Sequence, residues 1–250
     1  MTTSASHPSA LVTTKRSARM SRTYITWLVI MALLAFVSVL LQLFYPTGIV
    51  DPTQAMFFTW PALAIVALIG LMGIWLAGRT GFPEDWDARI PTGRRFVLPL
   101  CLGVVAGSLL VGLDVVTGFT QALATGHGVA QQYTGFVPML LTFTAAAVFI
   151  QVIYRLLFVP GPLWLISNVL LHGRAQVPVF WVLAVLTSVL EPLTQWTDLN
   201  AVPGAVFLTR LAMMFGLNLV EVVTWRKYGL LAMILVRVGF YIVWHVLYVH

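Results

Sequence analysis

Charged residues are scarce in this 250-residue sequence. Only 9% of the residues are Asp, Glu, Lys or Arg, whereas 60% are hydrophobic and the mean hydropathy is +0.93. A soluble globular domain carries about 25% charged residues, so that class is excluded. The composition predicts an all-α, polytopic integral membrane protein in contact with the lipid bilayer, because helices can satisfy their own backbone hydrogen bonds in lipid.

Cysteine and lysine are also nearly absent. The single cysteine, Cys101, excludes an internal disulfide and any metal site built from cysteines. The two lysines, Lys15 and Lys227, lie outside the middle of any apolar run, which excludes a retinal Schiff base. No P-loop, dinucleotide-binding fingerprint or His-x-x-x-His pair occurs, so we expect no cofactor. The net charge of +6 lies mainly between apolar runs, where it carries topology information, and we expect no nucleic-acid partner.

Seven apolar runs are long enough to cross a bilayer of about 30 Å at 1.5 Å per residue. They cover residues 24–44, 55–77, 96–119, 136–158, 179–195, 203–224 and 230–249. Residues 160–171 are also apolar but too few to span, so we expect a short interfacial or re-entrant helix there, started by Pro160 and Pro162. Residues 23–250 are therefore predicted to form one transmembrane helical domain.

The first 22 residues are rich in Ser and Thr and predict a disordered cytoplasmic tail. They carry the basic residues Lys15, Arg16, Arg19 and Arg22. A cleavable signal peptide is the alternative, but the following run has spanning length and no small-x-small cleavage site follows it, which favours a retained first helix. The mixed-charge segment 81–92 predicts a solvated cytoplasmic loop.

Basic residues alternate strictly between the connections. They occur in residues 1–22, 78–95, 171–178 and 225–229, and they are absent from residues 45–54, 120–135 and 196–202. Short cytoplasmic loops carry an excess of Lys and Arg. The alternation therefore predicts an N-terminus inside and a C-terminus outside.

Polar residues inside the apolar runs are few, and they are the candidate site residues. The set is Gln151, Arg155, Glu191, Gln195, Asn218, Glu221, Arg237 and His245. Several pairs are three or four residues apart, so each helix presents one polar stripe, which should face the bundle interior. Two interpretations remain open: the stripes hold helices together through hydrogen bonds and ion pairs, or they line a water-filled site for a substrate, ion or proton.

The predicted topology also places these residues by depth. The cytoplasmic half should contain Gln151, Arg155, Asn218, Glu221 and Arg237, and the outer half Asp114, Glu191, Gln195, Arg210 and His245. An unpaired charge at bilayer depth costs about 2.5–3.5 kcal/mol on insertion scales. We therefore expect Glu221 to neutralise Arg155 or Arg237.

Three short motifs follow one another in the C-terminal half. Residues 150–155 read Ile-Gln-Val-Ile-Tyr-Arg, Leu190 precedes Thr194 by four residues, and Phe215-Gly216 is followed by a basic turn, Gly229-Leu230, Arg237 and Tyr241. Over residues 136–250 this order resembles the CPBP family, the CAAX-protease and bacteriocin-processing (Abi) intramembrane metalloproteases. Their motifs are Glu-Glu-x-x-x-Arg, Phe-x-x-x-His and His-x-x-x-Asn.

The resemblance implies a metal site whose key residues this chain lacks. Gln151 stands at the second Glu, and Thr194 and Arg237 stand at the His positions. We therefore expect no catalytic residues and no metal, and a pseudoprotease of a bacterial plasma membrane that binds another membrane protein or a lipidated peptide. The alternatives are an active intramembrane endopeptidase with a rearranged metal site, or a small-solute or proton-coupled transporter. Their residue sets would be Glu191, Glu221 and His245 for the metal, and Asp114, Glu191 and Arg210 for the transporter.

Overall fold

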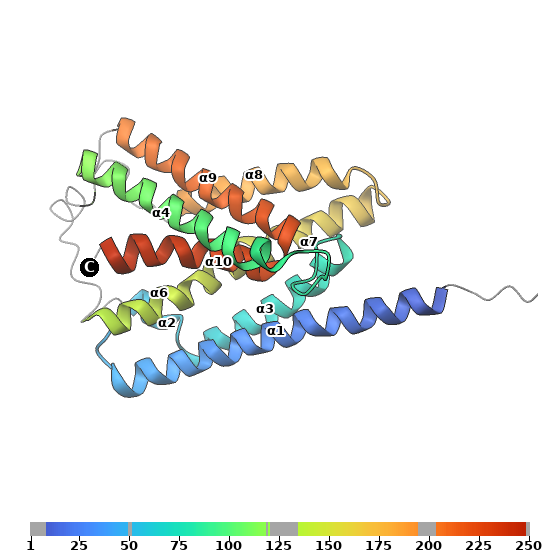
Figure 1. Ribbon diagram of the computed structural model, residues 1–250, viewed down its shortest axis with the longest axis horizontal. Helices are drawn as coiled ribbons and strands as arrows, with labels where there is room; N and C mark the ends of the chain where they lie inside the picture. Colours follow the sequence, from blue (N-terminus) through green and yellow to red (C-terminus); the bar gives the residue numbers. More distant parts are fainter. Residues whose placement is uncertain (1–8, 50–51, 119, 121–134, 195–203, 249–250) are drawn as a thin grey trace, which may run out of the picture.

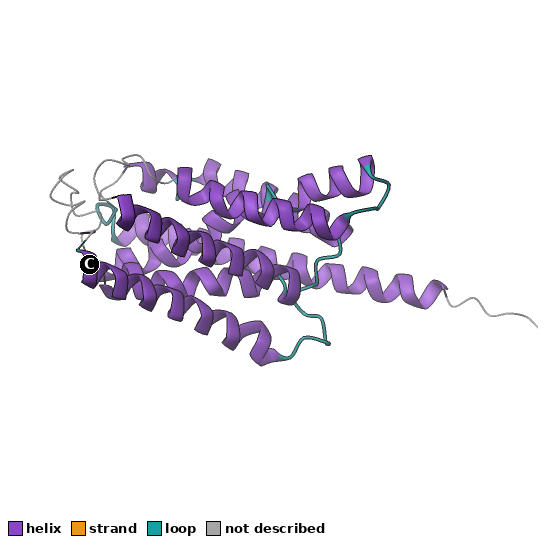
Figure 2. Cartoon of the chain, turned by 90° about the horizontal axis from the view of Figure 1, so that it is seen from above, coloured by secondary structure: helices purple, strands orange, loops and turns teal. Residues whose placement is uncertain are grey.

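The chain folds into a bundle of long helices that run side by side (Figures 1 and 2). The computed structural model describes residues 9–49, 52–118, 120, 135–194 and 204–248, and within these ranges it contains helices and connecting turns but no strand. The N-terminal end of α1 and the C-terminus lie at opposite ends of the bundle (Figure 1).

The helices follow the predicted apolar runs closely. Segments marked η have the wider turns of a π-helix. In chain order the elements are α1 (Ser9–Phe44), α2 (Pro52–Met56), α3 (Trp60–Arg79), η1 (Gly93–Val97), α4 (Leu98–Thr117), α6 (Phe136–Gln151), η2 (Val152–Leu156), α7 (Pro160–Leu163), η3 (Trp164–Leu170), α8 (Gln176–Thr194), α9 (Gly204–Tyr228), α10 (Leu230–Tyr241) and η4 (Ile242–Tyr248).

Seven helical stretches are long and apolar enough to cross a membrane, which confirms the predicted all-α, seven-span architecture. They are Arg22–Phe44, Trp60–Arg79, Gly93–Thr117, Phe136–Leu170, Gln176–Thr194, Gly204–Tyr228 and Leu230–Tyr248. The short helix expected at residues 160–171 is present as α7 and η3, which continue the helical stretch that begins at Phe136. Its Asn168 side chain donates a hydrogen bond to the Arg79 carbonyl at the end of α3.

Two segments outside the spans differ in part from what the sequence predicts. α1 begins at Ser9, so residues 9–22 are helical where a disordered tail is predicted. Ala, Leu, Lys, Arg and Met have high helix propensity, and no Gly or Pro interrupts residues 9–44, so the transmembrane helix extends in the N-terminal direction. Residues 1–8 lie outside the described ranges.

The segment 81–92 is only partly solvated, because Trp86 and Arg89 are exposed but Phe82, Asp85 and Asp87 are buried. The Phe82 ring packs on Trp225 with centroids 4.3 Å apart, and Asp85 Oδ1 accepts a hydrogen bond from the Leu231 backbone N–H at 3.0 Å. The loop therefore closes one end of the bundle over the α9–α10 turn. Gly229 in that turn has φ +100°, a backbone conformation that favours glycine.

Glycines let α4 and α10 approach each other at the backbone. A Cβ built on Gly103 would collide with the Val236 carbonyl oxygen, and one on Gly239 would lie 2.5 Å from the Leu100 carbonyl oxygen. Small residues at such crossings are the usual device for close helix packing in membranes. α10, which carries Arg237, is thereby held tightly inside the bundle.

Candidate functional site

Four ionisable side chains meet inside the bundle and form what we call the charge quartet: Arg155, Glu191, Glu221 and Arg237. They come from η2, α8, α9 and α10, so four different elements meet at this point. All four side chains are 0% exposed. Lipid offers no partner to a charged group, and the helices accordingly turn these side chains toward one another.

Each arginine contacts both glutamates. Arg155 Nη2 lies 3.0 Å from Glu191 Oε2 and 3.7 Å from Glu221 Oε2. Arg237 Nη2 lies 2.7 Å from Glu191 Oε1, and Arg237 Nε lies 2.7 Å from Glu221 Oε1. Two positive and two negative charges cancel, which offsets part of the cost of removing them from water. The predicted pairing of Glu221 with Arg155 or Arg237 is confirmed, and it involves both arginines.

Neutral groups also bond to the charge quartet. Arg237 Nη2 donates to Asn218 Oδ1 at 2.7 Å, and Asn218 Nδ2 donates to the Ser188 carbonyl oxygen at 3.1 Å. Pro192 lies inside α8 four residues after Ser188, and it has no N–H to offer that carbonyl. Asn218 therefore supplies the hydrogen bond that the helix cannot make, and it joins α8 to α9 beside the charges.

Arg155 also bonds to the backbone of α8. Its Nη1 donates to the Thr187 carbonyl oxygen at 3.1 Å, next to its ion pair with Glu191. Pro192 and the backbone of Thr187 and Ser188 were not among the predicted site residues. The signal that could have found them is the proline itself, because a proline inside a membrane helix frees a carbonyl that another polar group must satisfy.

Gln151 lies one helical turn before Arg155 and is 0% exposed. Among the described residues, neither its amide nitrogen nor its amide oxygen has a hydrogen-bond partner. The Ser188 hydroxyl and Arg155 Nε also have no hydrogen-bond partner among the described residues. These groups therefore retain hydrogen-bonding capacity inside the bundle. Each buried polar atom without a partner lowers the stability of the fold by about 1–3 kcal/mol.

His245 lies outside the quartet. Its ring stacks on Phe143, with centroids 3.9 Å apart and an interplanar angle of 9°, and it makes an edge contact with Tyr241 at 5.0 Å. Tyr241 connects the two regions, since its ring centre is 5.5 Å from Arg237 Cζ. The polar stripe of α10 and η4 therefore leads from the quartet into an aromatic environment.

A second polar contact lies farther along the same stripe. The Tyr248 hydroxyl donates to Asp114 Oδ2 at 2.7 Å, and the Thr120 backbone N–H donates to Asp114 Oδ1 at 2.8 Å. Arg210 Cζ lies 6.0 Å from the Trp244 ring centre. The three residues of the transporter alternative, Asp114, Glu191 and Arg210, therefore do not form one site. Glu191 belongs to the charge quartet, whereas Asp114 bonds to Tyr248 and Thr120. Gln195, the remaining predicted site residue, lies outside the described ranges.

The predicted depth of Glu191 is wrong. It was assigned to the outer half, opposite Arg155, Glu221 and Arg237, but it contacts both arginines directly. Figure 1 shows the reason: α8 is displaced along the bundle relative to α9, toward the end where α7 lies. Hydropathy indicates the length of a span but not how far it is displaced along the bundle relative to its neighbours. A depth counted from the ends of a span is therefore wrong where the span is displaced, as α8 is.

Metal binding requires about three ligands, and the described residues do not assemble them. No group of three or more His, Cys, Asp or Glu side chains in this part of the chain could hold a metal ion. Glu191 and Glu221 do meet, but the third member of the alternative ligand set, His245, stacks on Phe143 instead. The carboxylates are occupied by guanidinium groups.

Comparison of the chain with protein-family models, with curated proteins and with solved structures finds no match.

Proposed function

We propose that this multi-pass membrane protein has the layout of a CPBP intramembrane protease but no proteolytic activity, and that it acts by binding a lipidated peptide or a segment of another membrane protein. The charge quartet carries the first half of the proposal. Arg237 stands where the resemblance places a metal-binding His, and its guanidinium contacts both Glu191 and Glu221. A guanidinium has no lone pair to donate to a metal, and its positive charge repels a divalent cation.

A metal would also have to break the ion pairs that keep the arginines neutralised. Removing a carboxylate from Arg155 or Arg237 leaves a buried, uncompensated charge, which typically costs about 3–5 kcal/mol. Gln151 adds to this barrier because an amide cannot serve as a general base. The quartet therefore supports a structural role, the joining of η2, α8, α9 and α10.

An apolar cavity of about 270 Å³ between α4 and α9 supports the binding half of the proposal. Leu110 and Phe240 close its inner side, whereas Val105 and Leu109 on α4 are exposed. An exposed apolar cavity on a transmembrane helix pair fits a prenyl or acyl chain, or a large apolar side chain of a neighbouring helix. Gly216 of α9 lines the cavity, and a Cβ there would have nothing within 4 Å.

The orientation belongs to the same proposal. Basic residues gather at the end of the bundle where α1 begins. Arg79 is the last residue of α3, and Arg226 Nη1 donates a hydrogen bond to the carbonyl oxygen of Thr80. The loop that carries Arg89 closes this end. From the positive-inside rule we infer that this end faces the cytoplasm.

The test is the binding of a fluorescent farnesylated peptide to the purified protein in nanodiscs, with the unmodified peptide as reference. The substitution Gly216→Leu adds a side chain that projects into the cavity, with a Cβ that meets nothing within 4 Å, and should weaken binding about tenfold, since about two methylene groups of contact are lost. Gly112→Leu is the matched control on α4, because a Cβ at Gly112 also meets nothing within 4 Å and Gly112 does not line the cavity.

Elemental analysis and the fate of the peptide complete the experiment. We expect no stoichiometric zinc and an intact peptide. About one zinc per chain, together with chelator-sensitive cleavage, would overturn the claim of inactivity. Equal binding by the natural protein, Gly216→Leu and Gly112→Leu would overturn the cavity as the binding site.

A further inference from the structure

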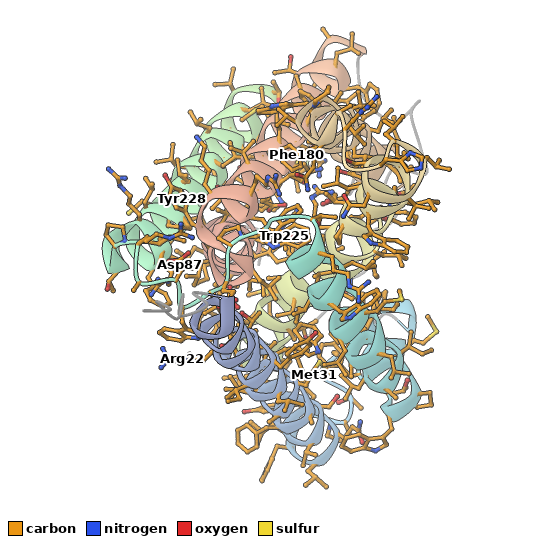
Figure 3. All side chains as sticks on the ribbon, turned by 90° about the vertical axis from the view of Figure 1, so that its right-hand side faces the viewer. Arg22, Met31, Asp87, Phe180, Trp225 and Tyr228 are labelled. Atoms are coloured by element: carbon orange, nitrogen blue, oxygen red, sulfur yellow. The ribbon has the colours of Figure 1, made fainter. Side chains whose placement is uncertain are left out.

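A second groove, of about 560 Å³, lies between α1, the loop that carries Trp86 and the start of α10. The residues with polar groups that line it are Arg22, Thr26 and Trp86, and the apolar ones include Ile25, Val29 and Leu33 of α1 and Leu231 of α10. Arg22 and the three apolar α1 residues are exposed. Figure 3, which looks onto this end of the bundle, shows Arg22 at the start of the bundled part of α1, near Asp87 of the loop.

The polarity of this α1 face changes abruptly along the helix. Residues 22, 26, 29 and 33 recur at intervals of four and three, so they share one face. The first is Arg22, and the last two are Val29 and Leu33. A positive charge therefore lies at one end of an apolar groove on the same helix.

The length of the groove matches one leaflet of a bilayer. Leu33 follows Arg22 by eleven residues, which corresponds to about 16 Å of helix at 1.5 Å per residue. Half of the hydrocarbon core is about 15 Å. Arg22 is also the last basic residue before the apolar run 24–44, which places its guanidinium at the level of the lipid headgroups.

Trp86 is held in place at this level by two contacts. Its indole Nε1–H donates to Thr26 Oγ1 at 2.7 Å, and the guanidinium of the buried Arg95 lies 5.5 Å from its ring centre. Arg95 is itself fixed by hydrogen bonds to the carbonyl oxygens of Asp87 and Ile90. The wall of the groove at headgroup level is therefore rigid and aromatic, while the adjacent Arg22 has no carboxylate partner among the described residues.

We propose that this groove binds one anionic phospholipid, with the phosphate at Arg22 and an acyl chain along Ile25, Val29 and Leu33. Charge complementarity selects the headgroup, because Arg22 is the charged residue among the described residues that line the groove, and none of these is acidic. The apolar part selects a lipid over a free phosphate. Basic residues immediately outside a membrane helix bind anionic headgroups, and each contributes about fivefold in affinity.

Native mass spectrometry of the full-length protein tests the proposal, with phosphatidylglycerol and phosphatidylcholine offered at equal concentration. The natural protein should retain one phosphatidylglycerol with about fivefold or greater preference. Arg22→Gln should reduce that preference about fivefold. Arg174→Gln is the matched control. Arg174 is also an exposed arginine in one of the basic connections, and it lies outside the groove.

Two further arms separate a lipid site from a phosphate site. Val29→Trp fills the apolar part and should reduce lipid retention while Arg22 remains. Soluble glycerol phosphate should not displace the bound lipid. Equal retention of the two lipids by the natural protein, or equal effects of Arg22→Gln and Arg174→Gln, would overturn the proposal, and so would displacement by glycerol phosphate or full retention by Val29→Trp.

Discussion

Asp85 shows how strongly one residue can depart from its expected environment. It lies in the loop predicted to be solvated, yet it is 0% exposed, with Oδ1 bonded to the Leu231 N–H and Oδ2 without a partner among the described residues. Burial raises the pKa of Asp85 to about 6, and this effect outweighs the backbone hydrogen bonds from Leu231 and Leu230 and the nearby Arg95 charge, which lower the pKa. The side chain caps the start of α10 at the cost of a poorly solvated carboxylate.

The raised pKa of Asp85 predicts a pH-dependent stability. Between about pH 4 and pH 6 the folded protein holds a proton that the unfolded chain releases, so the free energy of unfolding falls as pH rises through this window. The loss is about 3 kcal/mol at most and persists above pH 6. Asp85→Asn keeps the acceptor for Leu231 and removes the charge, so it should raise the melting temperature in detergent at pH 7.5 and flatten its dependence on pH.

Glu84→Gln is the control for the Asp85 experiment, since Glu84 is the neighbouring acid and is only partly buried. It should leave the pH dependence almost unchanged. A lower melting temperature for Asp85→Asn at both pH 5 and pH 7.5 would mean that the ionised carboxylate stabilises the α10 cap.

At the scale of the elements, the crossing of α4 and α10 depends on missing side chains. Gly103 and Gly107 on α4 face the backbone of α10, and Gly239 on α10 faces the backbone of α4. A second crossing follows the same rule, because the Trp27 ring of α1 occupies the space above Gly70 of α3, and its Nε1–H donates to the Ala67 carbonyl oxygen at 3.2 Å. Close approach at the first crossing fixes the position of α10, which carries Arg237 of the charge quartet.

Alanine substitutions should therefore have opposite effects at two glycines of α4. Gly103→Ala places a Cβ against the Val236 carbonyl oxygen and should destabilise the protein by about 1–3 kcal/mol, the usual cost of overpacking. Gly112→Ala meets nothing within 4 Å and should stabilise α4 by about 0.5–1 kcal/mol through helix propensity. Thermal unfolding in detergent measures both, and a Gly103→Ala protein as stable as Gly112→Ala would disprove the close crossing.

At the scale of the whole molecule, the bilayer explains why much of the fold could be predicted from the sequence. Spanning helices need about 20 apolar residues, so the seven spans and the short helix after Pro160 were predictable from length and hydropathy. The pairing of Glu221 with arginine followed from the cost of a lone charge in lipid. The register of one span against another depends on side-chain packing, and for this reason the position of Glu191 beside Arg155 was not predictable from span ends.

Other misses have the same origin. The burial of Asp85 depends on a turn in α9–α10 that lies almost 150 residues away in sequence, with Gly229 at its centre. The bond between Asn218 and Ser188 depends on Pro192, which leaves the Ser188 carbonyl free, and on the packing of α9 beside α8, which brings Asn218 within reach. Such contacts arise from tertiary structure and leave no periodic pattern in the chain.

We infer that the charge quartet is a neutral junction that holds four helical elements together. Glu221→Gln leaves two buried cations with one anion, and Arg237→Gln leaves two anions with one cation, so each should destabilise the protein by about 3 kcal/mol. The double variant keeps Arg155 paired with Glu191 at 3.0 Å, and the charges cancel again.

A double-mutant cycle on Glu221 and Arg237, read as thermal unfolding in detergent, tests this claim most directly. We predict that the double variant is more stable than the sum of the single effects allows, by about 1–3 kcal/mol, and that it recovers part of the lost melting temperature. Simple additivity of the two substitutions would contradict the account.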